Sequence, residues 1–282
     1  MAQTFNKKSI RVTITTQKGE TFVLEDFAID CSIQKNGGVE LSKSKVNIYG
    51  LKLETMQRLV WTQYRNRTLA YNRITVEAKE GNSAYSMVFK GEILFCVADF
   101  NGASPVLKIE ATTAALGKLI PDDPISVEGS QSAASLIESL AKKANLTFTN
   151  EGVTAQVSDT TLSGDPVTKM QSIARQVGAE LLIEDQHVTL LPKNKPKENV
   201  GGGSPVVDKD SGLIGYPTLT NTGVNCTCYY RPDIRLGSSV TVKTIVPMAS
   251  GTWLVTQVSH ELSANNPKKS AWKTSFTGTW WV

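Results

Sequence analysis

Short runs of alternating apolar and polar residues fill the last quarter of the chain, residues 211–282. Successive side chains of a pleated strand point to opposite faces, so such a run predicts a strand with one buried face. In the clearest run, that face would carry Val224, Cys226, Cys228 and Tyr230. Two more runs lie at residues 253–258 and 272–276, and glycines, prolines and asparagines separate the runs. This quarter therefore predicts a small antiparallel barrel or sandwich.

The first 115 residues carry the same alternation. Its best examples are Ile10, Val12 and Ile14, followed by Phe27, Ile29, Cys31 and Ile33. Further runs lie at residues 22–24, 46–48, 74–76, 85–89, 93–97 and 107–109. Together the runs predict about eight short strands, a number that suits a barrel.

One amphipathic helix interrupts these strands, over residues 51–65. Its buried stripe would consist of Leu53, Met56, Val60 and Tyr64, which recur at helical spacing. The arginines on or near this helix are Arg58, Arg65, Arg67 and Arg73. They could face an anionic partner or a negatively charged pore, or they could form a solvated surface with local ion pairs, which is the more common arrangement.

Residues 118–192 change character and predict an α+β domain. A first helix would follow an N-cap among residues 129–132. A second helix is better marked, since Asp165 and Pro166 fit its N-cap and first turn, and Gly178 fits the left-handed position after its end. The remaining predicted elements are a strand at residues 146–148 and a hairpin with strands at 181–184 and 188–191.

Residues 193–205 are rich in Pro, Gly and charge and lack apolar periodicity, so they predict a linker or exposed loop. We therefore expect a first β-barrel at residues 1–117, the α+β domain at 118–192 and a second β-barrel at 206–282. The predicted fold class is mainly β with α+β, in which two small antiparallel β-barrel domains flank an inserted α+β domain.

Composition limits the location and the partners of the protein. The sequence has neither a long apolar run that could span a membrane nor the apolar core of a secretory signal, so we expect a protein made in the cytoplasm and without a membrane partner. Its formal net charge is +4, with basic ends and an acidic middle. The basic residues form no dense stripe, which favours a solvated, mixed surface over a dedicated nucleic-acid interface.

Residues that could carry catalysis or bind metal occur in unsuitable patterns. Ser259, His260 and Glu261 are adjacent in a predicted strand, so neighbours would face opposite ways and could not align as nucleophile, base and orienting group. Cys226 and Cys228 would lie on one face about 7 Å apart, which is too far for a disulfide. They also lack further ligands for a metal, so we expect them in the core. The sequence predicts no enzyme activity, no catalytic or metal-binding residue and no cofactor.

Two carboxylate pairs, Asp122-Asp123 and Glu184-Asp185, lie at predicted turns, where solvation and capping account for them. His187 lies in a predicted hairpin turn. A hydrolase of cell-wall glycans needs two carboxylates held across a cleft, and no pair is marked out for that purpose. A cell-wall hydrolase component is thus only a second alternative function.

Aromatic residues near the C-terminus predict contacts with another protein. Trp280 and Trp281 are consecutive, as are Tyr229 and Tyr230, and consecutive strand residues face opposite ways. Both members of a pair therefore cannot enter the same core, so one would meet a covering loop or a partner. The candidate interface residues are Tyr229, Arg231, Trp280 and Trp281.

Several segments together form a longer pattern of strand and turn residues. They are Val46 to Leu51 before the helix, Arg231 to Ile234, Leu236 to Val242, Gly251 to Leu262 and Ala271 to Gly278. The pattern resembles the central baseplate hub proteins of contractile-tailed bacteriophages, the tail hub or spike-adaptor family. The resemblance extends over essentially the whole chain, in the order barrel, α+β insert, barrel.

The resemblance implies a structural protein of the virion tail baseplate, assembled in the host cytoplasm. Hub proteins of this kind are homotrimers whose two barrels per chain form a pseudo-sixfold ring. That ring adapts the sixfold tail tube above to the threefold tail spike below, with other baseplate proteins around it and DNA only in transit through its channel. The first alternative is a nucleic-acid-binding β-barrel protein, which would need aromatics beside clustered Lys and Arg.

Overall fold

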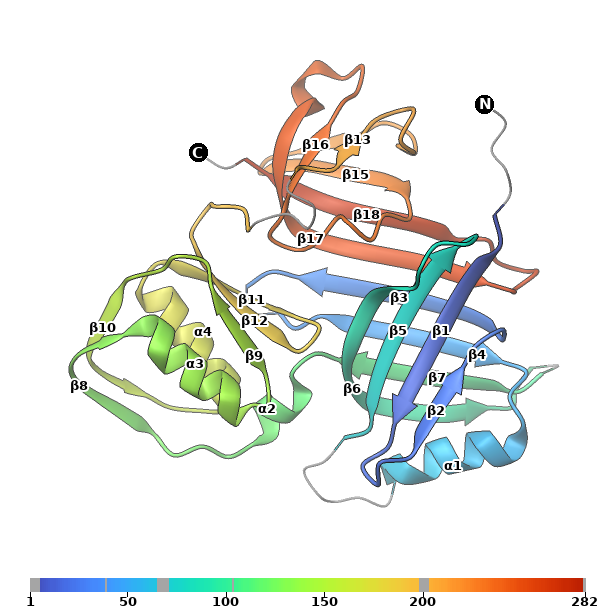
Figure 1. Ribbon diagram of the computed structural model, residues 1–282, viewed down its shortest axis with the longest axis horizontal. Helices are drawn as coiled ribbons and strands as arrows, with labels where there is room; N and C mark the ends of the chain where they lie inside the picture. Colours follow the sequence, from blue (N-terminus) through green and yellow to red (C-terminus); the bar gives the residue numbers. More distant parts are fainter. Residues whose placement is uncertain (1–5, 39, 65–70, 103, 198–202, 281–282) are drawn as a thin grey trace. The chain divides into compact units, whose positions relative to one another are not determined.

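The computed structural model describes every residue except 1–5, 39, 65–70, 103, 198–202 and 281–282, and only the backbone of 61–64 (Figure 1). The protein is mainly β, with 49% of its residues in strands and 15% in helices, which confirms the predicted class at this level. The chain divides into two compact units, each built from separate segments. Unit 1 comprises Met1–Ile33, Lys43–Thr112 and His260–Lys273, and unit 2 comprises Gln34–Ser42, Thr113–Ser259 and Thr274–Val282. Among the described helices, none combines the length and the hydropathy needed to cross a membrane.

Unit 1 is built on an antiparallel sheet. Its strands are β1 (Lys8–Thr15), β2 (Thr21–Leu24), β3 (Ala28–Asn36), β4 (Lys43–Tyr49), β5 (Arg73–Glu80), β6 (Ser86–Asp99) and β7 (Val106–Thr112). They lie in the order β3-β4-β7-β6-β5-β1-β2 (Figure 1). The order follows from antiparallel pairing of β4 with β7, β7 with β6, β6 with β5, β5 with β1 and β1 with β2.

Alternation gives these strands their buried face, as the sequence predicts. Ile10, Val12 and Ile14 of β1 are almost fully buried. They lie opposite Ala78, Val76 and Ile74 of β5, respectively, in the antiparallel register. Such cross-strand apolar pairs fix the register, because a slip of one residue would turn every apolar side chain to solvent.

The prediction for β6 is wrong in one respect. The runs at residues 85–89 and 93–97 suggest two strands, but the structure has one strand of 14 residues. Gly91 lets the strand continue, since a Cβ at this position would lie 2.5 Å from the carbonyl oxygen of Thr112 on β7. The register shifts just beyond Ile93, and Leu94 and Phe95 are both about half exposed there. Such a β-bulge re-aims side chains that regular alternation would place on opposite faces.

The predicted helix is confirmed as α1 (Leu53–Tyr64), between β4 and β5. Met56 and Leu59 are its fully buried residues among those whose side chains are described. Leu53 is 53% exposed, so the predicted stripe is wrong at the start of the helix. Leu59, which the prediction omitted, lies three residues after Met56 and so belongs to the same buried face.

Of the described arginines near α1, Arg58 follows the local ion-pair interpretation. Arg58 lies 3.2 Å from the Glu20 carboxylate and over the Phe22 ring, 5.1 Å from its centroid. Arg73 begins β5 and is exposed. Arg65 and Arg67 lie outside the described residues.

Unit 2 contains the predicted α+β part. Its elements are α2 (Ala115–Leu119), β8 (Ile125–Ser132), α3 (Ala133–Lys143), β9 (Thr147–Asn150), β10 (Gln156–Leu162), α4 (Pro166–Gln176), β11 (Ala179–Glu184) and β12 (His187–Pro192). β8 pairs with β10, and β11, β12 and β9 form a second sheet in which β9 is parallel to β12. The helices α3 and α4 pack together (Figure 1) and share an apolar core with both sheets. The sequence missed β10, whose residues are mostly polar.

The predicted helix caps are confirmed. The Ser132 side chain accepts a hydrogen bond from the Ser135 amide, and Asp165 accepts one from the Thr168 amide. Gly178 has a φ of +65°, the left-handed geometry expected after the end of α4. The β11–β12 hairpin turns at Asp185 and Gln186, which both have positive φ.

The C-terminal strands of unit 2 are β13 (Val206–Val207), β14 (Thr218–Thr220), β15 (Gly223–Tyr229), β16 (Ser239–Val242), β17 (Gly251–Ala264) and β18 (Trp272–Thr279), with a short 3-10 helix, η1 (Pro247–Ala249). β3, β17 and β18 belong to both units, so unit 2 holds β3 only from Gln34, β17 only up to Ser259 and β18 only from Thr274. The order β14-β15-β18-β17 continues through β16 to β13. Val224, Cys226 and Cys228 of β15 enter its core, as predicted.

Strand β17 departs from the predicted uniform alternation. Trp253, Leu254 and Val255 are all buried, and the apolar core of unit 2 includes Trp253 and Val255 at odd positions but Val258 at an even one. One irregular step between Val255 and Val258 accounts for the change. Gln257 is exposed and belongs to the outer face as a result.

Among the described residues, the strand pairs close neither unit into a barrel. The two-barrel arrangement therefore stays a prediction, as do the boundaries 1–117, 118–192, 193–205 and 206–282.

Candidate assembly interface

Trp280 follows β18 and has one covered face. Its ring packs against Trp253, with ring centroids 4.1 Å apart and planes inclined by 45°. Trp253 is fully buried, and its Nε1 donates a hydrogen bond to the Ala249 carbonyl of η1 at 3.1 Å. Trp280 nevertheless remains 58% exposed, so much of a large aromatic surface faces solvent. Trp281 lies outside the described residues.

Three exposed apolar side chains lie on or beside β14 and η1, and η1 is hydrogen-bonded to the Trp253 ring that packs against Trp280. Leu219 belongs to β14, which contacts η1, and Met248 lies in η1 itself. Ile245, two residues before η1, is 79% exposed, and Met248 is 73% exposed. Thr279, beside Trp280, donates from Oγ1 to the Thr222 carbonyl at the β14–β15 turn. We call Leu219, Ile245, Met248 and Trp280 the apolar end of unit 2.

Tyr229 ends β15 and is 49% exposed. Its backbone amide donates to the Gly212 carbonyl at 2.9 Å. A Cβ on Gly212 would lie 2.9 Å from the Tyr229 ring, and Gly212 has a φ of +102°. A glycine is therefore required beside Tyr229, whose outer ring surface is left accessible.

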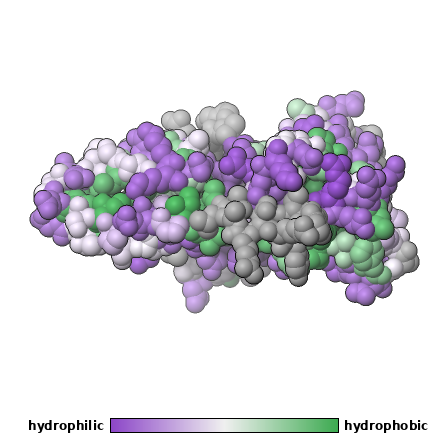
Figure 2. Space-filling view, turned by 90° about the horizontal axis from the view of Figure 1, so that it is seen from below, coloured by the Kyte–Doolittle hydropathy of each residue, from purple (hydrophilic) through white to green (hydrophobic). Residues whose placement is uncertain are grey.

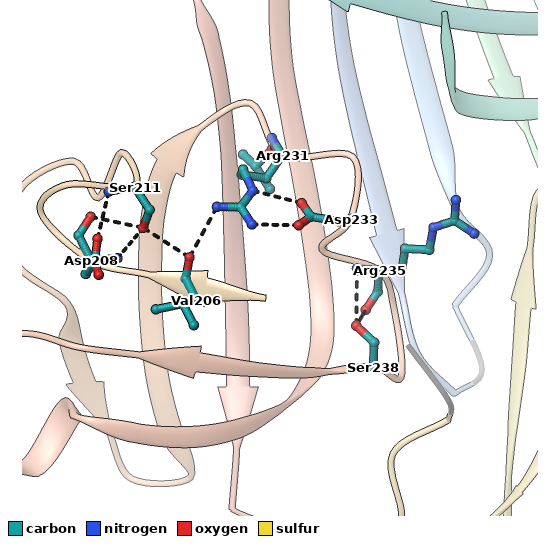
Figure 3. Close-up of polar contacts among 8 residues, drawn as sticks. Val206, Asp208, Ser211, Arg231, Asp233, Arg235 and Ser238 are labelled. Carbon is teal, nitrogen blue, oxygen red and sulfur yellow. Dashed lines mark hydrogen bonds and ion pairs between the residues drawn. The ribbon is translucent and has the colours of Figure 1, made fainter. Parts of the chain in front are cut away.

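Arg231 is held inside unit 2 (Figure 3). Its Nε and Nη2 donate to the two Asp233 carboxylate oxygens at 2.9 and 2.6 Å, and its Nη1 donates to the Val206 carbonyl at 3.2 Å. The bond to Asp233 raises the pKa of the guanidinium, and its side chain is 24% exposed. The bidentate pair with Asp233 orients the guanidinium within the loop after β15, and the bond to Val206 ties that loop to β13. The predicted interface role of Tyr229, Arg231, Trp280 and Trp281 stays a prediction.

A buried ion cluster corrects the interpretation of Glu184-Asp185 as a solvated turn. The Lys35 ammonium, almost fully buried, lies 2.8 Å from both Glu184 and Asp185. Lys197 reaches Glu184 at 3.1 Å and is also mostly covered, so the predicted linker is not fully exposed. Burial alone would raise the pKa of Glu184, but Lys35 and Lys197 outweigh burial and lower it to about 2.

Asp122 needs the same correction. It accepts from Nζ of Lys169 at 2.7 Å and from Nζ of Lys143 at 3.0 Å. Lys169 lies on α4 with no exposed surface, so the pair anchors the segment before β8 to that helix. The one sign of this pair in the sequence is Lys169 itself, a lysine on the apolar face of α4.

The histidines and cysteines occupy positions that suit packing. His260 is buried in β17 while Glu261 is exposed, which confirms that adjacent members of the Ser-His-Glu sequence differ in direction. His187 opens β12, and its Nδ1 lies 2.6 Å from Thr147 Oγ1. Burial lowers the pKa of His187. The four cysteines are buried free thiols, and burial raises their pKa values to about 12.

Among the residues that the structure describes, no His, Cys, Asp and Glu side chains gather as a metal site. Figure 2 shows a face on which hydrophilic and hydrophobic residues are interspersed. The polar clusters described above are buried ion pairs inside unit 2, and the side chains available to a partner are the exposed apolar ones.

Solved structures with a similar fold include two tail proteins, one of them from a prophage. The 43 kDa tail protein of prophage MuSo2 from Shewanella oneidensis is 8% identical, with a TM-score of 0.63 over 95% of this chain and 97% of that chain. The tail protein from Neisseria meningitidis MC58 is 10% identical, with a TM-score of 0.64 over 96% of each chain. At such low identity these similarities show the fold alone.

A third similar structure is the E. coli c3393 protein, a component of the type VI secretion system described as structurally similar to T4 bacteriophage tail proteins gp27 and gp5. It is 8% identical, with a TM-score of 0.62 over 91% of this chain and 74% of that chain. No curated protein matches the chain in sequence. The model of one protein family, described as Baseplate hub gp41, matches residues 9–268. Since this match covers most of the sequence, the chain belongs to the Baseplate hub gp41 family of bacteriophage baseplate proteins.

Proposed function

We propose that this protein is a non-enzymatic structural hub of a contractile phage tail baseplate, located in the virion after assembly in the host cytoplasm. The observation that carries the proposal is the family match over residues 9–268. In this proposal three copies form a ring with pseudo-sixfold symmetry, made of two similar barrels per chain at residues 1–117 and 206–282. The ring joins the sixfold tail tube to the threefold spike, touches other baseplate proteins and leaves a channel for DNA.

The apolar end of unit 2 supports the assembly part of this proposal. Exposed aromatic and Met side chains in one region are typical of protein interfaces, where Trp and Met are enriched. Ile245 and Met248 are each more than 70% exposed, so their burial in a contact would remove apolar area from water. We therefore propose that this surface contributes to the contacts between copies.

Charge in unit 1 gives no specific support to the nucleic-acid alternative. Lys45 pairs with Glu110 at 3.0 Å, and Lys108 pairs with Asp99 at 2.6 Å. Cations already paired with carboxylates release fewer counterions on binding phosphates.

Light scattering coupled to size-exclusion chromatography tests the ring. The 30.6 kDa chain should elute at micromolar concentration with about three times its own mass. A monomer, alone and in the presence of its spike protein, would contradict the proposal. An experimental structure of the assembled baseplate would then show whether residues 1–117 and 206–282 superpose as similar barrels, and unrelated folds there would refute the pseudo-sixfold symmetry.

A further inference from the structure

A groove of about 530 Å³ lies on the outer face of the C-terminal strands of unit 2. It crosses the end of β3, then β17, β18, β15 and β14. Its wall includes Gln34, Asn225, Thr227, Gln257, Ser275 and Thr277. We call it the polar groove, because amide and hydroxyl groups form most of its surface.

Strand alternation produces this groove. On β15, Cys226 and Cys228 enter the core, so Asn225 and Thr227 must face outward. On β18, Phe276 enters the same core and leaves Ser275 and Thr277 outside. The irregular step in β17 brings Gln257 to this outer face instead of the inner one.

Polar side chains in the groove bind one another across the strands. The Thr227 and Ser275 hydroxyls lie 2.9 Å apart, and Thr277 Oγ1 donates to Asn225 Oδ1 at 2.8 Å. Asn36 Nδ2 donates to the Glu40 carboxylate at 3.1 Å at one margin. These bonds hold the hydroxyl and amide groups of the surface in place, and Glu40 is the one charged residue among the described lining.

The charge of the groove matters for DNA. Affinity of proteins for DNA comes largely from Lys and Arg that neutralise phosphates and release counterions. Among the described residues that line the polar groove, there is no Lys or Arg. Apart from Ile214 and Tyr216, the described lining of the groove has no exposed large apolar side chain, in contrast to the apolar end of unit 2. A surface past which DNA must slide without sticking needs both properties.

We propose that the polar groove faces the central channel and forms the neutral surface over which DNA passes. The inference rests on the ring proposed above and adds which face of unit 2 points inward. Phosphates moving along hydroxyl and amide groups would keep their counterions and water, so passage would depend little on salt.

Cysteine labelling of assembled tails tests the direction of the groove. The variant Gln257→Cys adds an exposed thiol, whereas the four native thiols are buried and supply little background. The matched control is Gln131→Cys, also at an exposed strand position, on β8. Both variants should react in the free protein with a small maleimide and with one that carries a long polyethylene glycol chain. In assembled tails, the Gln257→Cys thiol should react with the small reagent and resist the long one.

Two results of this experiment would overturn the inference. Labelling of Gln257→Cys by the long reagent in intact tails, at the rate of the free protein, would place the groove outside. Protection from the small reagent would show that another protein covers it. If the protein is absent from the tails, or is a monomer, the proposed function fails; if it is present and Gln257 is labelled as an outer residue, only this inference fails.

Added charge gives a second, independent test. Phages carrying Gln257→Lys should eject DNA about threefold more slowly or worse at low salt, and the defect should shrink at high salt, because each added cation can bind a phosphate. Gln131→Lys should eject at the wild-type rate. Wild-type ejection by Gln257→Lys phages at low salt would contradict the proposal.

Discussion

At the scale of single residues, Lys35 is a buried cation held between two carboxylates. Burial lowers the pKa of an isolated ammonium, but Glu184 and Asp185 more than offset it, and the pKa of Lys35 is raised. The cluster joins β3 to the β11–β12 hairpin within unit 2. Removal of the cation alone would leave two mostly buried carboxylates without a partner of equal strength.

Lys35→Met should destabilise the protein by about 3–5 kcal/mol at neutral pH, the usual cost of breaking a buried ion pair from one side. In the wild type the pKa of Glu184 is lowered from 4.5 to about 2. The ion pair therefore stabilises the folded protein fully above pH 4.5, the pKa of the unfolded state, and this contribution is lost as the pH falls toward 2. The difference in urea unfolding free energy between the two proteins should therefore narrow over that window. A difference that is constant between neutral pH and pH about 2 would contradict the assignment.

At the scale of elements, β6 is one continuous strand because of a single residue, Gly91. Gly91 stands where many sequences would turn, and the sequence pattern around it suggests a break. The close approach of β7, known only from the fold, makes the strand continuous. The same glycine gives a sharp stability test.

Gly91→Ala should destabilise unit 1 by about 1–3 kcal/mol or more, because overpacking against backbone cannot relax through a side-chain rotamer. The added Cβ would lie 2.5 Å from the Thr112 carbonyl oxygen. Gly102→Ala is the matched control, since its Cβ would meet no atom closer than 3.7 Å. Thermal or urea unfolding measures both variants, and equal stability of the two would refute the close packing.

At the scale of the whole molecule, the apolar end of unit 2 is the described surface that best suits contacts between copies. Met248→Glu should leave the monomer as stable as the wild type, because the side chain is 73% exposed. It should weaken the trimer at least about tenfold in dissociation constant if Met248 is buried between copies, since a charge would then be desolvated. Mass measurements over a dilution series quantify the change.

Tyr216→Glu provides the control for this experiment, as an equally drastic change at an exposed residue of the polar groove. It should leave the mass of the assembly unchanged. A trimer that survives Met248→Glu with wild-type affinity would remove the apolar end from the interface.

Elements whose signals are local could be predicted from the amino-acid sequence. Alternation predicted most strands, because the two-residue period needs no distant contact, and the caps at Asp165 and Gly178 predicted the limits of α4 for the same reason. The pattern of strand and turn residues also led to the hub family. The charged residues were different: Glu184 and Asp122 look like turn residues until the fold brings Lys35 and Lys169 to them from far along the chain.

The tertiary structure sets the features that depend on what lies opposite a residue. In the fold, two predicted strands form one strand through Gly91. Gln257 lies on the outer face of β17, and Leu53 is exposed. The tertiary structure also shows that compact units need not follow the sequence, since unit 1 takes His260–Lys273 from near the C-terminus. Periodicity records which side of an element is apolar, whereas the partner of each side is set by long-range packing.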